Sequence, residues 1–576
     1  MSNSHSENGN KLTRRQALFL SAAAGVGAAF TGTAYASDST KTGGHQEPGT
    51  CSTPRKAVAN TQYGKVRGFV SGDVFTFKGI PYGQNTGGEN RWLPAKPPKP
   101  WDGEYPALIY GPNCPQNLHS WDRPAAKQGE GDAVWGSIEQ SFIQDWDDGY
   151  QNEDMLKLNV WTPSLTGKRP VMVYFHGGGF FFGSAYELPS QEGAQMARQH
   201  NVVSVTVNHR LNVLGFLDLS EIGGPAYADS VNVGMTDLVA ALQWVRDNIA
   251  NFGGDPDNVM IYGQSGGGSK VTCLMGMPSA AGLFHRAAVQ SGGGGNPPSA
   301  EQSREYAKYV MAQLGLRPND IGALQKMDWA TLNAAAAAVA EKVNGPRPKS
   351  LGMGAPSGAT PHVGSGPTVD GRVITMRSFF EGAPDISKNV PMLIGSVSEE
   401  GNRMSSKPTE AEWHDSLAEM IGDAKAAALI AAMKKAHPEK SIPTLSYGVS
   451  GLLVRNNVTR MAGMKHDRKA APVFTYFFTW QSPMLEDAGA WHTAELAFCF
   501  DNTKRCEQGT GNTPEAQKLA KQMATAWANF ARTGNPSQSG LTWKPFDPDQ
   551  CPTMVFDNKC RMENDPEGEV RKILLS

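Results

Sequence analysis

A serine flanked by small residues is the first place in this chain where a side chain could perform covalent chemistry. The segment Gly263–Gly268 reads Gly-Gln-Ser-Gly-Gly-Gly and follows the apolar run Val259–Tyr262. The pattern Gly-x-Ser-x-Gly between a strand and a helix is typical of a tight, strained turn that projects the serine hydroxyl above the end of a sheet. Ordinary glycine-rich turns carry the same pattern, so Ser265 is a candidate nucleophile that needs support from other residues.

A second glycine-rich segment provides what such a nucleophile would need. His176–Phe180 reads His-Gly-Gly-Gly-Phe and follows the apolar run Pro170–Phe175. Attack on an ester carbonyl moves negative charge onto its oxygen, and consecutive glycines let backbone N–H groups approach that oxygen closely. We therefore expect Gly178 and Gly179, together with Gly266, to form an oxyanion hole. A phosphate-binding loop is the alternative, but the lysine and Ser/Thr of a P-loop do not accompany these glycines.

Apolar runs separated by helical patterns predict the scaffold that positions these two segments. Unbroken apolar runs suit strands buried on both faces, and they predict an α/β fold with a large, mostly parallel central sheet and helices on both faces. The expected parallel strands are Pro170–Phe175, Val202–Val207, Val259–Tyr262, Ala287–Gln290, Val390–Ile394 and Val473–Phe478. Earlier runs at Gly64–Val70 and Val74–Ile80 predict an antiparallel edge, and the clearest helices are Met235–Phe252 and Ala516–Ala531.

Two stretches do not follow the alternation of apolar strands and helices, and we predict that each is a helical cap insertion. They lie near 297–361 and 410–437, within what we interpret as a single domain over residues 56–576. The Ala-rich run inside the first stretch indicates helix propensity rather than a low-complexity tail.

Six further motifs accompany the two glycine-rich segments, and together they resemble the type B carboxylesterase and cholinesterase family. These motifs are Phe77–Tyr82, Asn152–Asp154, Asn208–Leu211, Ala241–Val245, Phe252–Pro256 and Gln290–Gly292. The match covers nearly the whole chain after its first residues and looks like a bacterial, para-nitrobenzyl-esterase-like member. The resemblance implies the α/β-hydrolase fold, a serine esterase acting on a small-molecule ester, and a Ser-Glu-His triad without metal or cofactor.

The acid of the implied triad falls on one of two adjacent glutamates. The expected strand Val390–Ile394 leads to Ser398–Gly401, which reads Ser-Glu-Glu-Gly. The family pattern places the acid immediately before the glycine, at Glu400, while Glu399 is the alternative. Either residue could instead be an ordinary solvated loop charge.

The base of the implied triad is His492. It lies in Trp491–Leu496, which resembles the family's His-x-x-Glu segment, and it follows the serine and the acid in the chain order of this fold. We expect His492 to take the proton of Ser265, Glu400 to orient the imidazole, and water to hydrolyse a covalent acyl-enzyme.

The resemblance also suggests supporting residues. It implies a buried hydrogen-bond network between Glu495 and Ser291, although ordinary core packing accounts for a buried glutamate equally well. Phe180 and Phe181 follow the oxyanion glycines and are candidates for an apolar acyl pocket, although some aromatic side chains there must belong to the core.

Two departures from the animal pattern bear on the substrate. Gln264 precedes the serine where that pattern has glutamate, and Met155 stands where it has a cysteine, which leaves Cys114 without its usual partner. A choline substrate would lose an anionic neighbour, so we expect neutral, apolar or aromatic esters. The remaining alternatives are a non-catalytic binding module, and a specialised amidase, carbamate or toxin-ester hydrolase with the same residues.

The N-terminus predicts export. Twin arginines at Arg14 and Arg15 precede the apolar stretch Ala17–Phe30 and the small residues Ala34 and Ala36. This pattern is typical of a twin-arginine signal peptide over residues 1–36, cleaved after Ala36, with a flexible linker at 37–55 and a periplasmic or secreted product. The apolar stretch is shorter than the roughly 20 residues that span a bilayer, so we expect no stable membrane insertion after cleavage.

Composition limits the remaining partners. The net charge is −2 and the charged residues are spread along the chain, which argues against a nucleic-acid partner and leaves the oligomeric state open. Among seven cysteines, the close pairs Cys499/Cys506 and Cys551/Cys560 are candidates for disulfides, and none has the spacing of a structural zinc site.

Overall fold

The continuous apolar runs of the chain form the middle of a large mixed sheet. The computed structural model describes residues 57–116, 142–344, 363–364, 366–401 and 407–575, and the backbone of Thr50–Cys51. The signal peptide predicted at 1–36 lies outside these residues, as do most of 37–55 and the end of the first predicted insertion. Within the predicted linker, Thr50–Cys51 pairs with Val70–Ser71 as strand β1. The described elements belong to one compact unit that spans Pro48–Ser576.

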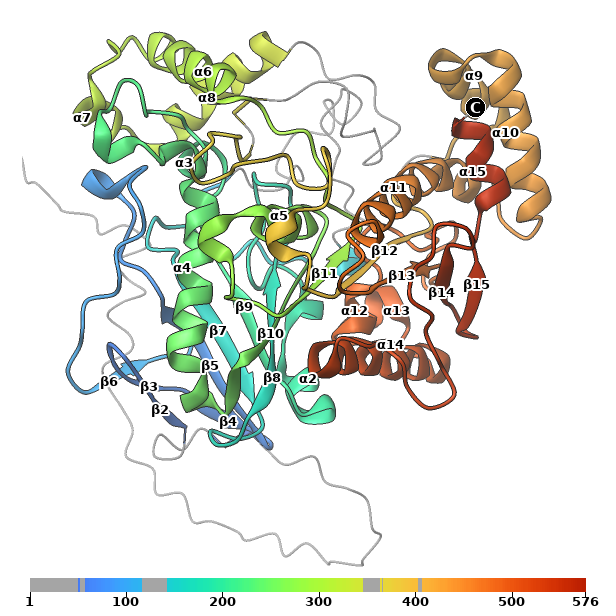
Figure 1. The fold of residues 1–576 in the computed structure, drawn as a ribbon, viewed down its shortest axis with the longest axis horizontal. Coiled ribbons are helices and arrows are strands. Elements are labelled where there is room, and N and C mark those ends of the chain that lie inside the picture. Colours follow the sequence, from blue (N-terminus) through green and yellow to red (C-terminus); the bar gives the residue numbers. More distant parts are fainter. Residues whose placement is uncertain are drawn as a thin grey trace, which may run out of the picture. The chain divides into compact units, whose positions relative to one another are not determined.

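In the described chain this sheet has twelve strands, in the order β1-β4-β5-β7-β9-β8-β10-β11-β12-β13-β14-β15 (Figure 1). The strands from β9 to β14 run parallel. Their bounds are β8 Arg169–Phe175, β9 Val203–Val207, β10 Gly254–Gln264, β11 Arg286–Gln290, β12 Met392–Val397, β13 Val473–Phe478 and β14 Pro552–Phe556.

Antiparallel strands form both edges of the sheet, and a small separate sheet lies beside it. The edge strands are β1 Thr50–Cys51, β4 Phe69–Ser71, β5 Val74–Pro81, β7 Lys157–Thr162 and, at the far edge, β15 Arg561–Asn564. The predicted early strand Gly64–Val70 is divided, because its first half, β3 Gly64–Arg67, joins β2 Val58–Thr61 and β6 Glu104–Pro106 in the second sheet.

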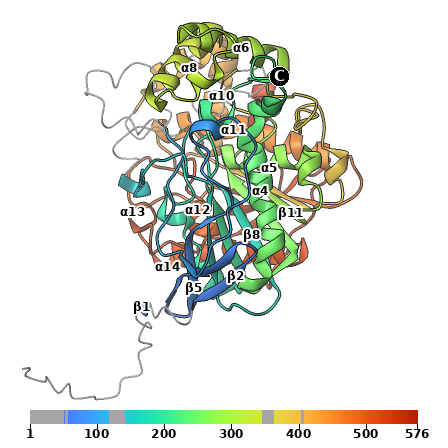
Figure 2. The ribbon, with the colours of Figure 1, turned by 90° about the vertical axis from the view of Figure 1, so that its left-hand side faces the viewer.

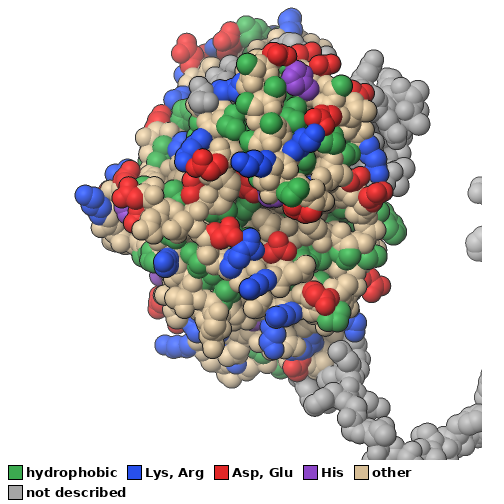
Figure 3. Space-filling view, turned by 90° about the vertical axis from the view of Figure 1, so that its right-hand side faces the viewer, with side chains coloured by type: hydrophobic (Ala, Val, Ile, Leu, Met, Phe, Trp, Pro, Cys, Tyr) green, Lys and Arg blue, Asp and Glu red, His purple; other side chains and the backbone are tan. Residues whose placement is uncertain are grey.

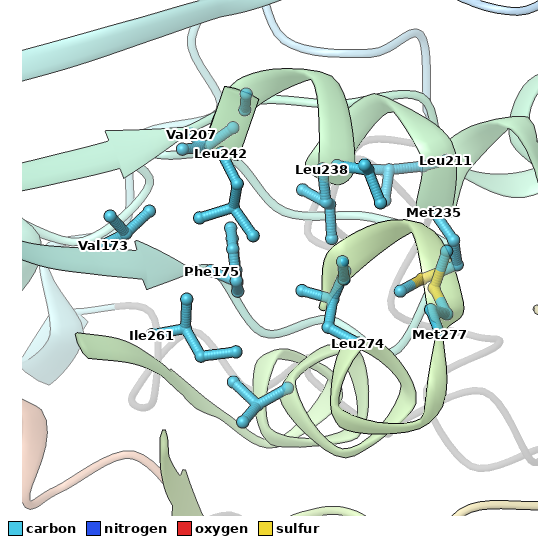
Figure 4. Close-up of a cluster of buried hydrophobic side chains, with 14 of the residues drawn as sticks. Val173, Phe175, Val207, Leu211, Met235, Leu238, Leu242, Ile261, Leu274 and Met277 are labelled. Carbon is cyan, nitrogen blue, oxygen red and sulfur yellow. The ribbon is translucent and has the colours of Figure 1, made fainter. Parts of the chain in front are cut away.

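Alternating side chains of the parallel strands enter two hydrophobic cores, one on each face. On β8, Val173 and Phe175 contribute to the first core, while Met172 and Tyr174 contribute to the second. The first core lies under α4 Val233–Asn248, α5 Gly266–Gly276 and α11 Ile442–His466, and the second under α2 Ala194–His200 and α14 Pro514–Thr533. Figure 4 shows the first core, with Val173, Phe175 and Ile261 of the strands facing Leu238 and Leu242 of α4 and Leu274 of α5.

Helices fill the described parts of both predicted insertions. The first contains α6 Ala300–Gln313, α7 Ile321–Leu324 and α8 Trp329–Asn344, which gather at the top of Figures 1 and 2. The second contains α9 Glu410–Ile421 and α10 Asp423–Ala436, separated by Gly422, and they pack with α15 Gly568–Leu575. Figure 3 views this side and shows basic and acidic side chains interspersed on its surface. An ion pair joins Lys434 of α10 to Glu410 of α9.

The two candidate disulfides are absent from the described residues. Cys499, Cys506, Cys551 and Cys560 are all free thiols, as are Cys114 and Cys273, while the side chain of Cys51 is not described. The thiols of the second pair have different neighbours, because Cys551 Sγ lies 3.4 Å from the Pro548 carbonyl and Cys560 Sγ lies 3.3 Å from Gln522 Oε1. Neither candidate pair is bridged in this structure.

Among the described residues, no helix is both long enough and apolar enough to cross a bilayer.

Candidate active site

Ser265 lies at the sharp junction between β10 and α5. Its backbone angles are φ 58° and ψ −122°, a strained combination for a residue with a side chain. Its N–H donates to the Gln290 carbonyl of β11 at 2.7 Å. Glycines surround it because nothing larger fits: a Cβ added to Gly263 would lie 2.5 Å from the backbone of Gly267, and one on Gly267 would lie 2.0 Å from the Phe175 carbonyl oxygen. The turn therefore has the tight, strained strand-to-helix geometry that the Gly-x-Ser-x-Gly pattern predicts, and we call it the elbow.

The loop after β8 lies directly against this elbow. Gly178 and Gly179 have φ values of 75° and 62°, a left-handed backbone that favours glycine. A Cβ added to Gly266 would lie 2.4 Å from the Gly179 nitrogen, so the first residue of α5 touches the loop. The carbonyl of Gly178 accepts from the N–H groups of Phe181 and Phe182 at 3.1 and 3.3 Å, which closes the loop into a tight turn.

His492 and Glu400 are in direct contact at the carboxyl ends of the strands. The imidazole Nδ1 donates to Glu400 Oε2, and the two residues are only 5% and 1% exposed. The other carboxylate oxygen of Glu400 accepts from the Val397 N–H at 3.1 Å, which anchors the acid to the last residue of β12. A carboxylate bound to Nδ1–H fixes the tautomer in which Nε2 carries the free lone pair.

Glu399 points to a different set of partners. Its carboxylate accepts from the Ala490 N–H and from Lys440 Nζ, both at 2.7 Å, and it contacts the Ser398 hydroxyl. A β-bridge also joins Glu399 to Trp491. The adjacent glutamates therefore divide two tasks: Glu400 contacts the imidazole, while Glu399 attaches the histidine-bearing loop to the end of β12.

Gln264 contacts the opposite edge of the imidazole. Its side-chain nitrogen lies 3.0 Å from His492 Nε2, and because Nδ1 is already a donor, the amide N–H donates to Nε2. Its side-chain oxygen would lie 3.2 Å from a Cβ on Gly177, so the amide lies between the histidine and the glycine loop. The sequence marks Gln264 as a departure from the animal pattern of the family, but it does not predict this contact.

The two candidate pocket phenylalanines have different surroundings. Phe180 is partly buried and packs edge-on against Phe216, with ring centroids 5.5 Å apart. The side chain of Phe181 is among the exposed large apolar groups, at 38% exposure. Phe180 therefore belongs in part to the first core, and Phe181 has the more accessible ring.

Glu495 is buried, but no hydrogen bond joins it to Ser291 among the described residues. Gln290, the last residue of β11, donates from Nε2 to Glu495 Oε1 at 3.5 Å, and Glu495 directly precedes the short helix α12, Leu496–Cys499. The Ser291 hydroxyl has no hydrogen-bond partner in that part of the chain. Burial, and secondarily the charge of Glu400, raises the pKa of Glu495 to about 8. Among the described residues, the hydrogen bond of Glu495 is therefore with Gln290 and not, as the resemblance implies, with Ser291.

No metal site accompanies these groups in the part of the chain that the structure describes. Nowhere in that part do three or more His, Cys, Asp or Glu side chains form a group that could hold an ion. One further charged residue, Lys270 on α5, lies behind the glycine loop and has no counterpart in the sequence-based predictions.

The fold and the elbow together define the class of this protein. A mostly parallel sheet, helices on both faces and a serine on a strained strand-to-helix turn make an α/β-hydrolase. The sequence profile of the carboxylesterase family matches residues 55–572. The chain belongs to the carboxylesterase family and is a carboxylic ester hydrolase.

Characterised relatives align over most of the chain. The para-nitrobenzyl esterase of Bacillus subtilis is 31% identical over 90% of this chain and 98% of its own length. The phenmedipham hydrolase of Pseudarthrobacter oxydans is 31% identical over 88% of this chain and 96% of its own. A solved esterase from Clostridium hathewayi, described as hydrolysing aliphatic aromatic polyesters, has a TM-score of 0.73 and 32% identity and covers 91% and 99% of the two chains.

Proposed function

We propose that Ser265, His492 and Glu400 form the catalytic triad of this esterase. The observation that carries the proposal is the buried contact of His492 Nδ1 with Glu400. This contact leaves Nε2 of the same imidazole as an acceptor, and Ser265 lies at the elbow of the same chain. In the proposed reaction Nε2 takes the serine proton as the hydroxyl attacks the ester carbonyl, and the imidazolium then protonates the leaving alcohol. Water hydrolyses the acyl-enzyme by the same route, and no cofactor is required.

The proposed oxyanion hole consists of the N–H groups of Gly178, Gly179 and Gly266. The close approach of Gly266 to the Gly179 backbone supports this, because it brings the two glycine segments together next to Ser265. Losing one such donor typically costs about 3 kcal/mol of transition-state stabilisation.

The proposed substrates are neutral, apolar or aromatic esters, with Phe181 and the exposed part of Phe180 bordering the acyl group. The residue before the nucleophile is an uncharged glutamine, which offers a cationic substrate no attraction. Profiling p-nitrophenyl esters against choline esters tests this, and a clear preference for choline esters would overturn it. The similarity to phenmedipham hydrolase keeps a specialised amidase, carbamate or toxin-ester hydrolase as a second candidate, which assays with amide and carbamate substrates address.

The proposed location is the periplasm or the cell exterior, reached after the signal peptide is cleaved after Ala36. The proposed catalytic domain comprises residues 56–576. The twin-arginine pattern supports this, and we propose no membrane insertion of the cleaved chain and no nucleic-acid partner. Intact-mass measurement of the exported protein tests the cleavage site.

The first experiment compares p-nitrophenyl butyrate hydrolysis by the chain lacking residues 1–36 with that of its Ser265→Ala variant. Removing a triad serine generally lowers the rate by several orders of magnitude, so we expect near-complete loss at unchanged thermal stability. An inactive parent, or a variant as active as the parent, would overturn the nucleophile assignment and favour a non-catalytic binding module.

A further inference from the structure

Lys270 is a fully buried lysine that the mechanism above does not use. It lies on α5, five residues after Ser265, and is 0% exposed. Its Nζ donates to the His176 carbonyl at 2.8 Å and more weakly to the Gly177 carbonyl at 3.4 Å. Burying a lysine costs several kcal/mol unless its charge is compensated, so a lysine here needs a specific explanation.

Burial and one neighbouring acid act in opposite directions on the charge of Lys270. Burial lowers the pKa of Lys270 to about 7, and Glu187, whose own pKa burial raises to about 7, opposes that decrease when it is ionised. The pKa values of His176 and His209 are held well below the ordinary value, first by burial and then by the charge of Lys270, so both rings are neutral. The face of the Phe180 ring, whose centroid is 5.8 Å from Nζ, completes the surroundings.

The two carbonyls that Lys270 binds belong to the peptide units leading into the proposed oxyanion hole. The carbonyl of Gly177 and the N–H of Gly178 share one planar, conjugated peptide group. This carbonyl accepts from Lys270 Nζ and, at 3.0 Å, from Nδ1 of the neutral His176 ring. Donation to a carbonyl oxygen draws electron density from the amide and makes its N–H a stronger donor, an effect that is larger for a charged donor in a dry interior.

We propose that Lys270 is a positioning residue that fixes and polarises the oxyanion loop from behind, so that the Gly178 N–H binds the developing oxyanion more strongly. The inference rests on the proposed function, because it requires Gly178 to face the substrate carbonyl. Its effect is confined to states in which that oxygen carries charge. Lys270 therefore acts on the transition state far more than on substrate binding.

The test is the Lys270→Met variant of the chain lacking residues 1–36. We expect kcat for p-nitrophenyl butyrate to fall roughly 10- to 100-fold while KM changes less than about threefold, because only the charged state loses stabilisation. Affinity for an alkyl trifluoromethyl ketone, whose serine adduct carries an oxyanion, falls by the same factor as kcat/KM. Unchanged kcat, or a lower kcat with unchanged ketone affinity, would overturn the inference.

Lys465 provides a matched control. Its Nζ also donates to two backbone carbonyls, those of Ser387 and Lys388, both at 2.8 Å, and it is 1% exposed, but this site precedes the amino end of β12. Lys465→Met is expected to lower thermal stability and leave kcat and ketone affinity unchanged. If it weakens ketone binding as much as Lys270→Met does, general destabilisation is the explanation and the inference fails.

A second variant keeps the test independent of folding. Lys270→Gln retains an N–H donor without the charge, and we expect a loss of kcat smaller than that of Lys270→Met. Wild-type activity of Lys270→Gln would show that the positive charge of Lys270 does not contribute to catalysis. Ser265→Ala separates the two proposals. An active Ser265→Ala overturns the proposed function itself, whereas an inactive Ser265→Ala beside a fully active Lys270→Met overturns only the role of Lys270.

Discussion

Adjacent side chains at the end of β12 illustrate how the site depends on single residues. Glu400 contacts His492, and Glu399 binds Lys440 and the Ala490 backbone. We predict that Glu400→Gln lowers kcat by about 10³- to 10⁴-fold, because the amide neither selects the tautomer nor stabilises the imidazolium. Glu399→Gln should instead lower the melting temperature and reduce kcat less than tenfold, because it leaves Lys440 without its counter-charge.

Steady-state kinetics and thermal melting of both variants check this pair of expectations. A larger loss of kcat in Glu399→Gln than in Glu400→Gln would move the acid of the triad to Glu399.

The contact of Gln264 with His492 Nε2 leads to a second prediction at this scale. A carboxylate in place of the amide, 3.0 Å from Nε2, would stabilise the imidazolium, which cannot act as a base. Gln264→Glu should therefore shift the acidic limb of the kcat/KM profile upward by about one pH unit and leave the alkaline plateau nearly unchanged.

Profiles between pH 5 and pH 9 measure this shift. Gln302→Glu makes the same change at the exposed N-terminus of α6, where the oxygen that caps Ser299 is kept, and its profile should coincide with that of the parent. A Gln264→Glu profile that also coincides with the parent would mean that the contact is absent from the active enzyme.

The buried Glu495 leads to a third prediction at this scale, which concerns how the stability of the folded chain changes with pH. The pKa of Glu495 in the folded chain is about 8, above the ordinary value of 4.5. Between these two pH values the folded chain keeps a proton that the unfolded chain releases. Its contribution to stability is present below pH 4.5 and is lost as the pH rises through about 8. The melting temperature of Glu495→Gln, which cannot ionise, should decline less between pH 5 and pH 9 than that of the parent. Parallel declines would contradict it.

At the scale of elements, the predictability of the fold follows from how each segment is buried. Strand β13 has the predicted bounds, and β8 begins one residue early, because strands covered on both faces are continuous apolar runs. The sequence pattern does not predict α11, whose buried residues lie on several sides and include glycines and an arginine. The residues of the proposed triad lie in family motifs, whereas the contact of Gln264 and the proposed role of Lys270 depend on where α5 and the glycine loop meet.

The connection between β9 and α4 depends on one buried ion pair. Arg210 donates through Nε and Nη2 to both oxygens of Asp237, at 2.8 and 2.6 Å, and the two side chains are 1% and 0% exposed. Removing one charge of such a pair leaves the other uncompensated, at a cost of about 3 kcal/mol or more. We predict that Asp237→Asn lowers the melting temperature by several degrees.

An exposed pair of the same geometry serves as the control. Arg317 donates to Asp320 through Nε and Nη2 at 3.0 and 2.9 Å, with side chains 81% and 26% exposed. Exposed pairs contribute about 0 to 1 kcal/mol, so Asp320→Asn should change the melting temperature by less than about 2 °C. Equal shifts in the two variants would show that burial does not determine the contribution of these pairs.

At the scale of the whole molecule, the free thiols and the proposed export route are compatible. Twin-arginine signals direct chains that fold before export, in a reducing compartment, and the six described cysteines are unpaired. A chain of this size buries enough apolar surface to fold without cross-links. The close spacing of Cys551 and Cys560 makes them candidates for a bridge, but Cys551 precedes β14, Cys560 lies between β14 and β15, and their thiols contact different oxygens.

We therefore predict that the chain lacking residues 1–36 melts at the same temperature, within about 1 °C, with and without a reducing agent. A thiol reagent should react with at least six groups per chain in denaturant and with far fewer in the native state, because Cys114, Cys499 and Cys506 are buried and burial raises their pKa values. Fewer reactive thiols in denaturant, together with a melting temperature that falls on reduction, would show that this chain contains a stabilising disulfide and would contradict the prediction.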